Sequence, residues 1–156
     1  MPVSIISADD AAALNVMGER LTPVTPAGPE LSVHVFDTSA PGQRAGEAGP
    51  PVHRHPWDEI YVVLRGVLEV FDGQGWRQAV AGACVTVPAG QWHSYRNGTA
   101  DCRFLTITGP GGGRAFFEEA DAEVTTFPPD MDAALAVAAR NSVEAMADHE
   151  SPDSQA

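Results

Sequence analysis

Short apolar runs, rich in valine, isoleucine and aromatic residues, alternate with clusters of glycine and proline along most of the chain. Such runs are typical of β-strands, and turn residues placed closely between them favour antiparallel pairing. The predicted strands cover residues 31–36, 60–64, 67–71, 76–80, 84–87, 92–96 and 102–108. The pattern therefore predicts an all-β fold, a small antiparallel β-barrel or sandwich.

The strand at 60–64 is apolar at every position. Because successive side chains of a strand point to opposite faces, Tyr61 shares the face of Glu59, whereas Ile60 and Leu64 share the other face. We expect the row of Tyr61 to line the barrel interior and the other row to pack against the second sheet or a covering layer. The pattern thus predicts a strand buried on both faces.

Two segments after the last strand have helical character, 114–121 and 130–147. The second opens with Asp130, a residue type favoured at helix N-caps, and places Met131 and Leu135 at helical spacing. We expect it to form a C-terminal helix that covers the barrel. The alternative is a contact in a homodimer, because many small barrels associate.

With 156 residues, of which 44% are apolar, the chain has the length and the composition of one globular domain. Its parts follow from the predicted elements. They are an N-terminal extension at 1–30, a barrel core at 31–110, a helical cover at 111–147 and a disordered tail at 148–156.

The charge of the chain restricts its partners. Nine basic residues against 21 acidic ones give a net charge of −12, which repels phosphate backbones and anionic lipids, so we expect neither nucleic acid nor a membrane as partner. All nine basic residues are arginine, which excludes a lysine Schiff base and a Walker P-loop. The first ten residues lack the regions of a secretory signal, so we expect a cytoplasmic protein.

The candidate chemistry lies in two short motifs. In an extended chain, His53, His55 and Glu59 project to the same face, because their spacings are even. His93 follows a Pro-Ala-Gly bend, where a neighbouring strand can present it to the same point. Imidazoles with a carboxylate suit one divalent transition metal, Fe, Mn, Co, Ni or Zn, and four such ligands leave coordination positions open for catalysis.

Both motifs resemble those of the cupin superfamily. The first cupin motif, H-x-H, three residues, E, six residues, G, is matched by His53, His55, Glu59 and Gly66. The second, G, five residues, P-x-G, two residues, H, three residues, N, is matched by Gly82, Pro88, Gly90, His93 and Asn97. One position departs, because Glu47 stands where the first motif begins with glycine. The resemblance implies a cupin or jelly-roll barrel and a metal held by the three histidines and the glutamate.

The segments 50–66, 102–113 and 115–121 are similar to single-domain quercetinase-like cupins, which carry a Phe-Phe-Glu segment after a Pro-Gly turn. This closer resemblance implies a dioxygenase, in which the metal activates a flavonol or related enol for reaction with dioxygen. Glu59 is then the catalytic residue, a ligand that can also take the proton of the substrate hydroxyl. The expected partner is an aromatic or enolic small molecule.

Aromatic side chains provide candidates for a substrate pocket, with plain core packing as the alternative. They are Phe36, Trp57, Tyr61, Tyr95, Phe104 and Phe116.

The ligand set leaves other functions open. A metal-dependent isomerase, cyclase or lyase would use the cation to polarise a carbonyl group without dioxygen. A non-catalytic cupin that binds a small molecule is the third interpretation.

Overall fold

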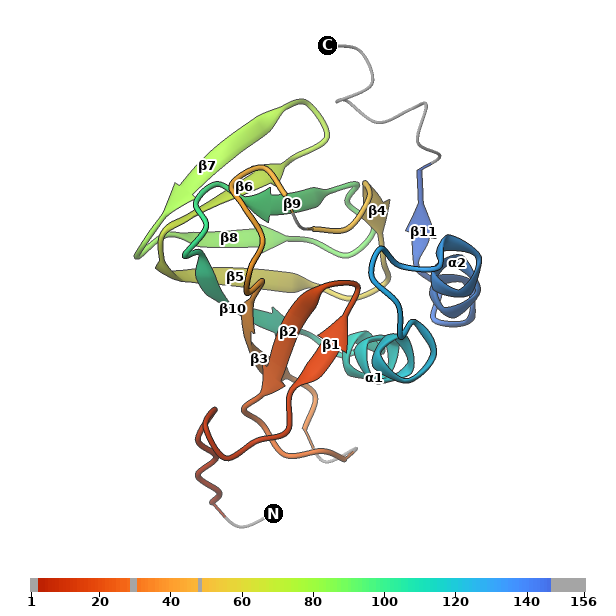
Figure 1. Ribbon diagram of the computed structural model, residues 1–156. Helices are drawn as coiled ribbons and strands as arrows, with labels where there is room; N and C mark the ends of the chain where they lie inside the picture. The colour runs from red at the N-terminus through yellow and green to blue at the C-terminus, as the bar shows by residue number, and fades with distance from the viewer. Residues whose placement is uncertain (1–2, 29–30, 48, 147–156) are drawn as a thin grey trace.

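Two antiparallel sheets contain most of the strands (Figure 1). The computed structural model describes residues 3–28, 31–47 and 49–146. The larger sheet contains, in spatial order, β1 (Leu14–Val16), β2 (Glu19–Pro23), β3 (His34–Ser39), β10 (Arg103–Thr108), β5 (Glu59–Arg65) and β8 (Cys84–Val87). The smaller sheet contains β7 (Trp76–Val80), β6 (Val67–Phe71) and β9 (Ser94–Asn97), and a separate pair joins β4 (His53–Arg54) to β11 (Glu144–Ala145). The predominance of antiparallel strands confirms the predicted fold class.

The chain changes sheets between β5 and β6. These strands are consecutive in sequence, yet β5 pairs with β8 and β10, whereas β6 pairs with β7 and β9. Gly66 makes this corner with a φ of 71°, and a Cβ there would lie 2.3 Å from Thr99 Oγ1. Only glycine fits such a backbone without strain, which explains this position of the first motif.

One core cluster gathers side chains of the facing strands. Tyr61 and Val63 of β5 pack with Leu68 of β6 and Phe104 of β10, and each is at most 1% exposed. The prediction that β5 is buried on both faces is wrong for the face that carries Ile60 and Leu64. Leu64 is 45% exposed there, and Ile60 and Val62 are only partly buried.

A second core cluster lies between the helices and the start of the larger sheet. Helix α1 (Gly113–Glu123) contacts β1 and helix α2 (Met131–Arg140), and the ring of Phe117 packs edge-on against Phe36 with centroids 5.1 Å apart. Val137 of α2 is fully buried in this cluster. Neither helix of the described chain combines the length and the apolar character needed to cross a membrane.

Helix α2 is shorter than predicted. Asp130 caps it as expected, and its carboxylate accepts hydrogen bonds from the N–H groups of Asp132 and Ala133. The predicted end at residue 147 is wrong, because the helix stops at Arg140 and Ser142 has a φ of 58°. The chain then turns back as β11, and the tail predicted at 148–156 lies outside the described residues.

The N-terminal segment contributes to the larger sheet. Within residues 1–30, interpreted above as an extension, β1 and β2 form a hairpin, and β2 pairs with β3. Met17 and Gly18 make the turn with φ values of 49° and 89°. This hairpin brings side chains from the beginning of the chain to the site described next.

Candidate metal centre

Three histidines from two neighbouring segments converge at one point. His53 belongs to β4 and His55 follows it, while His93 lies opposite, before β9. His53 and His93 form a β-bridge in which each backbone N–H donates to the other carbonyl oxygen at 2.9 Å. One ring nitrogen from each of the three side chains lies within 4.8 Å of the others. The two sequence motifs therefore meet in space.

The backbone fixes the orientation of all three rings. In each, Nδ1 lies 2.8 to 2.9 Å from a carbonyl oxygen two residues away, that of Pro51 for His53, Trp57 for His55 and Gln91 for His93. An Nδ1–H that donates to these oxygens leaves the Nε2 lone pair free, which is the tautomer that a metal ligand needs. His93 Nε2 is buried and has no hydrogen-bond partner within the described residues.

Glu59, the first residue of β5, lies beside two of the three histidines. Its Oε2 lies 3.2 Å from Nε2 of His55 and 3.5 Å from Nε2 of His93, and the hydroxyl of Tyr61 donates to the same oxygen at 2.6 Å. Burial opposes the charged carboxylate, but the hydrogen bond with His55 and the nearby ring of His93 outweigh it and lower the pKa of Glu59 below its ordinary value. Glu59 is thus an anion inside the protein.

The same surroundings keep His53 neutral. Burial lowers the pKa of its ring to about 3, and the neighbouring His93 adds to the effect, although Glu59 opposes it. A neutral imidazole can bind a cation without first losing a proton.

These residues fit a divalent metal. Two ligand atoms that each lie about 2.1 Å from one ion are separated by about 3 Å, close to the distances between Glu59 and the two histidines. His55 faces an acceptor at both ring nitrogens, the carbonyl of Trp57 and the carboxylate of Glu59. Either a second proton or a cation between Nε2 and the carboxylate satisfies this arrangement. The four-residue ligand set nevertheless remains a prediction.

The turn after β8 holds the two motifs together. The N–H of Gly90 donates to the carbonyl of His55 at 2.8 Å, and the N–H of Ala89 donates to the carboxylate of Asp58 at 2.9 Å. Asp58 thereby links the segment of His55 to the turn that precedes His93, a role that the sequence alone does not reveal.

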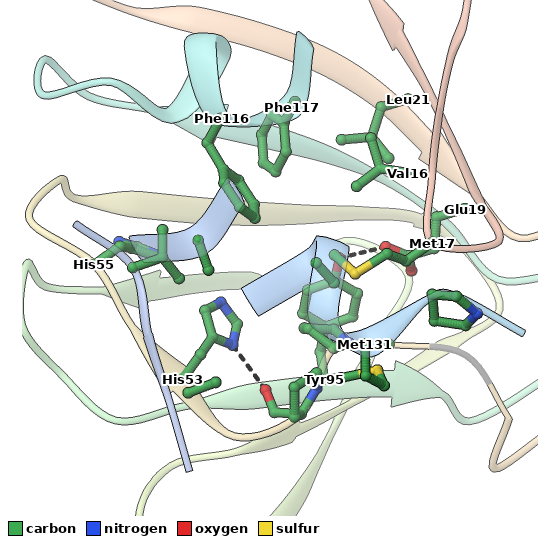
Figure 2. A pocket seen from close by; sticks show the side chains of 18 of the residues that line it. Val16, Met17, Glu19, Leu21, His53, His55, Tyr95, Phe116, Phe117 and Met131 are labelled. Atoms are coloured by element: carbon green, nitrogen blue, oxygen red, sulfur yellow. Dashed lines mark hydrogen bonds between the residues drawn. The ribbon is translucent and has the colours of Figure 1, made fainter. Parts of the chain in front are cut away.

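A cavity of about 560 Å³ opens beside the histidines. Figure 2 shows His53 and His55 on one side of it and apolar side chains of β1, β2 and α1 above it. Helix α2 provides further apolar side chains, among them Met131 and Ala134. Its charged lining residues, as far as the structure describes them, are acidic: Glu19, Glu47 and Glu59.

Residues 42–108, which include both motifs and most of the strands, match the family model of the cupin domain. The fold is a cupin fold. No curated protein matches the sequence.

Solved structures support the cupin fold. A sugar phosphate isomerase of the cupin superfamily from Silicibacter pomeroyi has a TM-score of 0.60 and 22% identity, over 70% of this chain and 77% of its own. KdgF from a Halomonas species has a TM-score of 0.59 and 19% identity, over 69% and 94%. The polyketide cyclase RemF from Streptomyces resistomycificus has a TM-score of 0.57 and 17% identity, over 69% and 80%. At these identities the likeness extends to the fold alone.

The aromatic residues proposed for the pocket fall into two groups in this structure. Trp57, Tyr95 and Phe116 line the cavity, and the ring of Trp57 stacks on that of His55 with centroids 4.2 Å apart. The others are buried in the two core clusters and are not among the lining residues: Phe36, Tyr61 and Phe104.

Sequence reasoning did not identify Glu19 as part of the site. It lies on β2, lines the cavity and is 7% exposed. The hydroxyl of Tyr95 donates to its Oε2 at 2.6 Å, and burial raises the pKa of Glu19 to about 7. The available signal was the turn at Met17-Gly18, which starts a strand with Glu19 and Leu21 on the same face.

Proposed function

We propose that this cupin is a metal-dependent dioxygenase that acts on an apolar molecule without a negative charge and with an enolic or phenolic hydroxyl group. The observation that carries the proposal is that the histidine cluster adjoins an apolar cavity. The charged residues described in the lining of this cavity are all acidic.

The lining favours a hydrophobic, uncharged substrate. A cavity of about 560 Å³ is within the usual size range of small-molecule sites. Phosphates and carboxylates are normally bound by arginine, lysine or helix N-termini, whereas here Glu19 and Glu59 would repel them. We therefore expect an aromatic or enolic molecule rather than a phosphate or a carboxylate.

Four residues would hold the metal: His53, His55, Glu59 and His93. When bound, the metal would supply a Lewis acid that stabilises negative charge on a substrate oxygen. Glu59 accepts the proton of the substrate hydroxyl on its carboxylate, while the hydroxyl of Tyr61 keeps that carboxylate in place. The apolar walls, including Phe116, exclude water from the resulting enolate.

Dioxygen would be the oxidant of this reaction. Both of its atoms enter the substrate, which supplies all the electrons, so the reaction needs no external reductant. The deprotonated enol is the electron-rich carbon nucleophile that makes this addition favourable.

The first experiment tests the metal and the use of oxygen together. Protein purified without an affinity tag is assayed for bound metals, and a panel of flavonols and enolised 1,3-diketones is then screened with an oxygen electrode. We expect one metal ion per chain and consumption of one dioxygen per substrate. Turnover that is equal under air and nitrogen would contradict the dioxygenase.

The catalytic role of Glu59 gives a sharper prediction. The Glu59→Gln variant cannot accept the proton, so we expect turnover to fall by about 100-fold or more while much of the metal stays bound to the histidines. Glu123→Gln, which removes an exposed carboxylate on α1, serves as the matched control. Wild-type turnover in Glu59→Gln would refute the proposed base.

A cyclase or isomerase that does not use oxygen is the second candidate. It is supported by the two buried carboxyl groups of the cavity, Glu19 and Glu59, which could remove and return protons on opposite sides of one substrate. RemF, a polyketide cyclase, has a similar fold. Substrate conversion without oxygen consumption in the same screen would favour this candidate.

A further inference from the structure

Glu19 is a carboxyl group in an unusual place. It lies on the wall of an apolar cavity, next to Met17 and Leu21, and it is 7% exposed. Figure 2 shows it across the cavity from His53 and His55. It is therefore on a different wall from these two histidines.

The protein provides hydrogen-bond partners for only part of the Glu19 carboxyl group. Oε2 accepts the hydrogen bond from Tyr95, and no other hydrogen bond of the Glu19 side chain occurs within the described chain. The other oxygen, Oε1, is not among the buried atoms that lack a partner, so it keeps some accessible surface, and Glu19 is one of the residues that line the cavity. A largely buried carboxyl group with an unfilled acceptor is costly to the fold, and this oxygen is available to a hydrogen-bond donor that enters the cavity.

Tyr95 holds this carboxyl group in a defined position. Its ring packs edge-on against Tyr61 and Phe104, with centroids 5.1 Å and 5.5 Å away. The hydroxyl group that contacts Glu19 is thus fixed by the core rather than by a mobile loop. A carboxyl group held in this way is preorganised for one hydrogen bond into the cavity.

We infer that Glu19 and Tyr95 form a second polar subsite, which receives a hydroxyl group at the end of the substrate far from the histidines. The substrate would then be an elongated apolar or aromatic molecule with an oxygen function at both ends. One end faces the histidines and Glu59, and the other donates to Oε1 of Glu19. For the first end, this inference rests on the proposed function.

The chemistry of the cavity favours a hydroxyl group at this subsite. Acidic lining residues disfavour an anionic group, and the apolar side chains around Glu19 make the burial of an ammonium group costly. A neutral hydroxyl group loses less on leaving water, and it donates to a carboxyl group in either protonation state. The subsite would thus select among substrates of similar apolar area.

The test compares ligands that differ only in the far hydroxyl group. Binding of 2-naphthol and 2,6-dihydroxynaphthalene, and of 4-hydroxybiphenyl and 4,4′-dihydroxybiphenyl, is measured by isothermal titration calorimetry. Symmetry alone gives each dihydroxy compound a twofold advantage. We expect a further five- to tenfold preference in at least one pair, the size of one hydrogen bond. Absence of any preference beyond twofold in both pairs overturns the inference.

Variants assign the preference to Glu19. Glu19→Leu removes the hydrogen bond and should reduce the ratio to about twofold, whereas Glu19→Gln should keep it, because the amide also donates and accepts. Glu123→Leu and Glu123→Gln are the matched controls and should retain the wild-type ratio. Circular dichroism verifies folding, and Glu19→Ala replaces Glu19→Leu if the latter fails to fold. An unchanged ratio in the apolar variant overturns the inference.

Metal removal separates this inference from the proposed function. The titrations are made with the protein as isolated and again after treatment with EDTA. Loss of the metal should weaken the binding of all four compounds and leave the affinity ratio within each pair unchanged. If EDTA alters no affinity, the metal proposal fails. The affinity ratio within each pair still tests whether Glu19 binds the far hydroxyl group. If the ratio disappears with the metal, Glu19 is not an independent subsite.

Discussion

Two buried carboxyl groups, Glu19 and Glu59, face the same cavity, and their pKa values are shifted in opposite directions. Each accepts a hydrogen bond of 2.6 Å from a tyrosine hydroxyl group. Glu59 also has His55 and His93 beside it, which lower its pKa, whereas burial raises the pKa of Glu19 to about 7. One site thus contains an anion next to the histidines and a weaker acid on the far wall, a pairing suited to acid and base roles.

The raised pKa of Glu19 predicts a pH-dependent stability. Between pH 4.5, its ordinary pKa, and about 7, Glu19 binds more protons in the folded state than in the unfolded state, so its contribution to the free energy of unfolding falls as pH rises. The loss amounts to about 3 kcal/mol and is complete above the folded pKa. Tyr95 and Glu59 are the neighbouring groups that set this pKa together with burial.

Glu19→Gln removes this proton uptake. Relative to wild type, the variant should gain about 3 kcal/mol between pH 4.5 and 8, measured by urea denaturation at a series of pH values. Glu123→Gln, an exposed position, should follow the wild-type curve. Parallel curves for wild type and Glu19→Gln would contradict the raised pKa.

The sequence predicted the histidines more readily than Glu19. His53, His55 and His93 occur at fixed spacings around turn residues, from which their convergence was predicted, and the structure brings them together. Glu19 is far from both motifs and enters the site only through the hairpin of β1 and β2 and its contact with Tyr95. Tertiary neighbours of this kind have no local signal.

At the scale of elements, α2 depends on its first residue. The Asp130 side chain accepts from two backbone N–H groups that have no partner within the helix. Asp130→Ala should lower the free energy of unfolding by about 1 kcal/mol, measured by urea denaturation. Asp130→Asn retains an acceptor at the cap and should stay within a few tenths of a kcal/mol of wild type. Equal losses in both variants would show that the cap bonds do not matter.

The end of α2 shows why helix boundaries are hard to predict. Residues 141–147 contain apolar positions that continue a helical pattern, so the prediction extended through them. In the structure, Val143 is buried in the second core cluster, and the chain then pairs with β4. Long-range pairing overrides a local propensity here.

At the scale of the whole molecule, the free energy of unfolding depends on the side chains packed between the two sheets. Leu68 is fully buried between the sheets, whereas Leu64 is 45% exposed on the outer side of β5. Leu68→Ala should lower the free energy of unfolding by roughly 2 to 5 kcal/mol, and Leu64→Ala by about 0.5 kcal/mol or less. Chemical denaturation of both variants measures the difference. Similar losses at the two positions would contradict the assignment of the core.

The strands were largely predictable, but their arrangement was not. The segments 67–71, 76–80 and 84–87 agree with β6, β7 and β8 residue by residue, because each is bounded by turn residues. The pairing of β5 with β8 and β10, and not with β6, depends on contacts between distant segments. Alternation gives the face of a side chain but not the neighbour of its strand.

The pairing of β11 with β4 joins the candidate ligand strand to a much later part of the chain. Arg54 and its ion-pair partner Glu144 are 90 residues apart, and the N–H of Met146 donates to the carbonyl of Val52 at 2.8 Å. During translation, His53 therefore leaves the ribosome long before the strand that flanks it. Because this pairing joins segments far apart in sequence, this edge of the histidine cluster stays uncovered during folding until β11 docks.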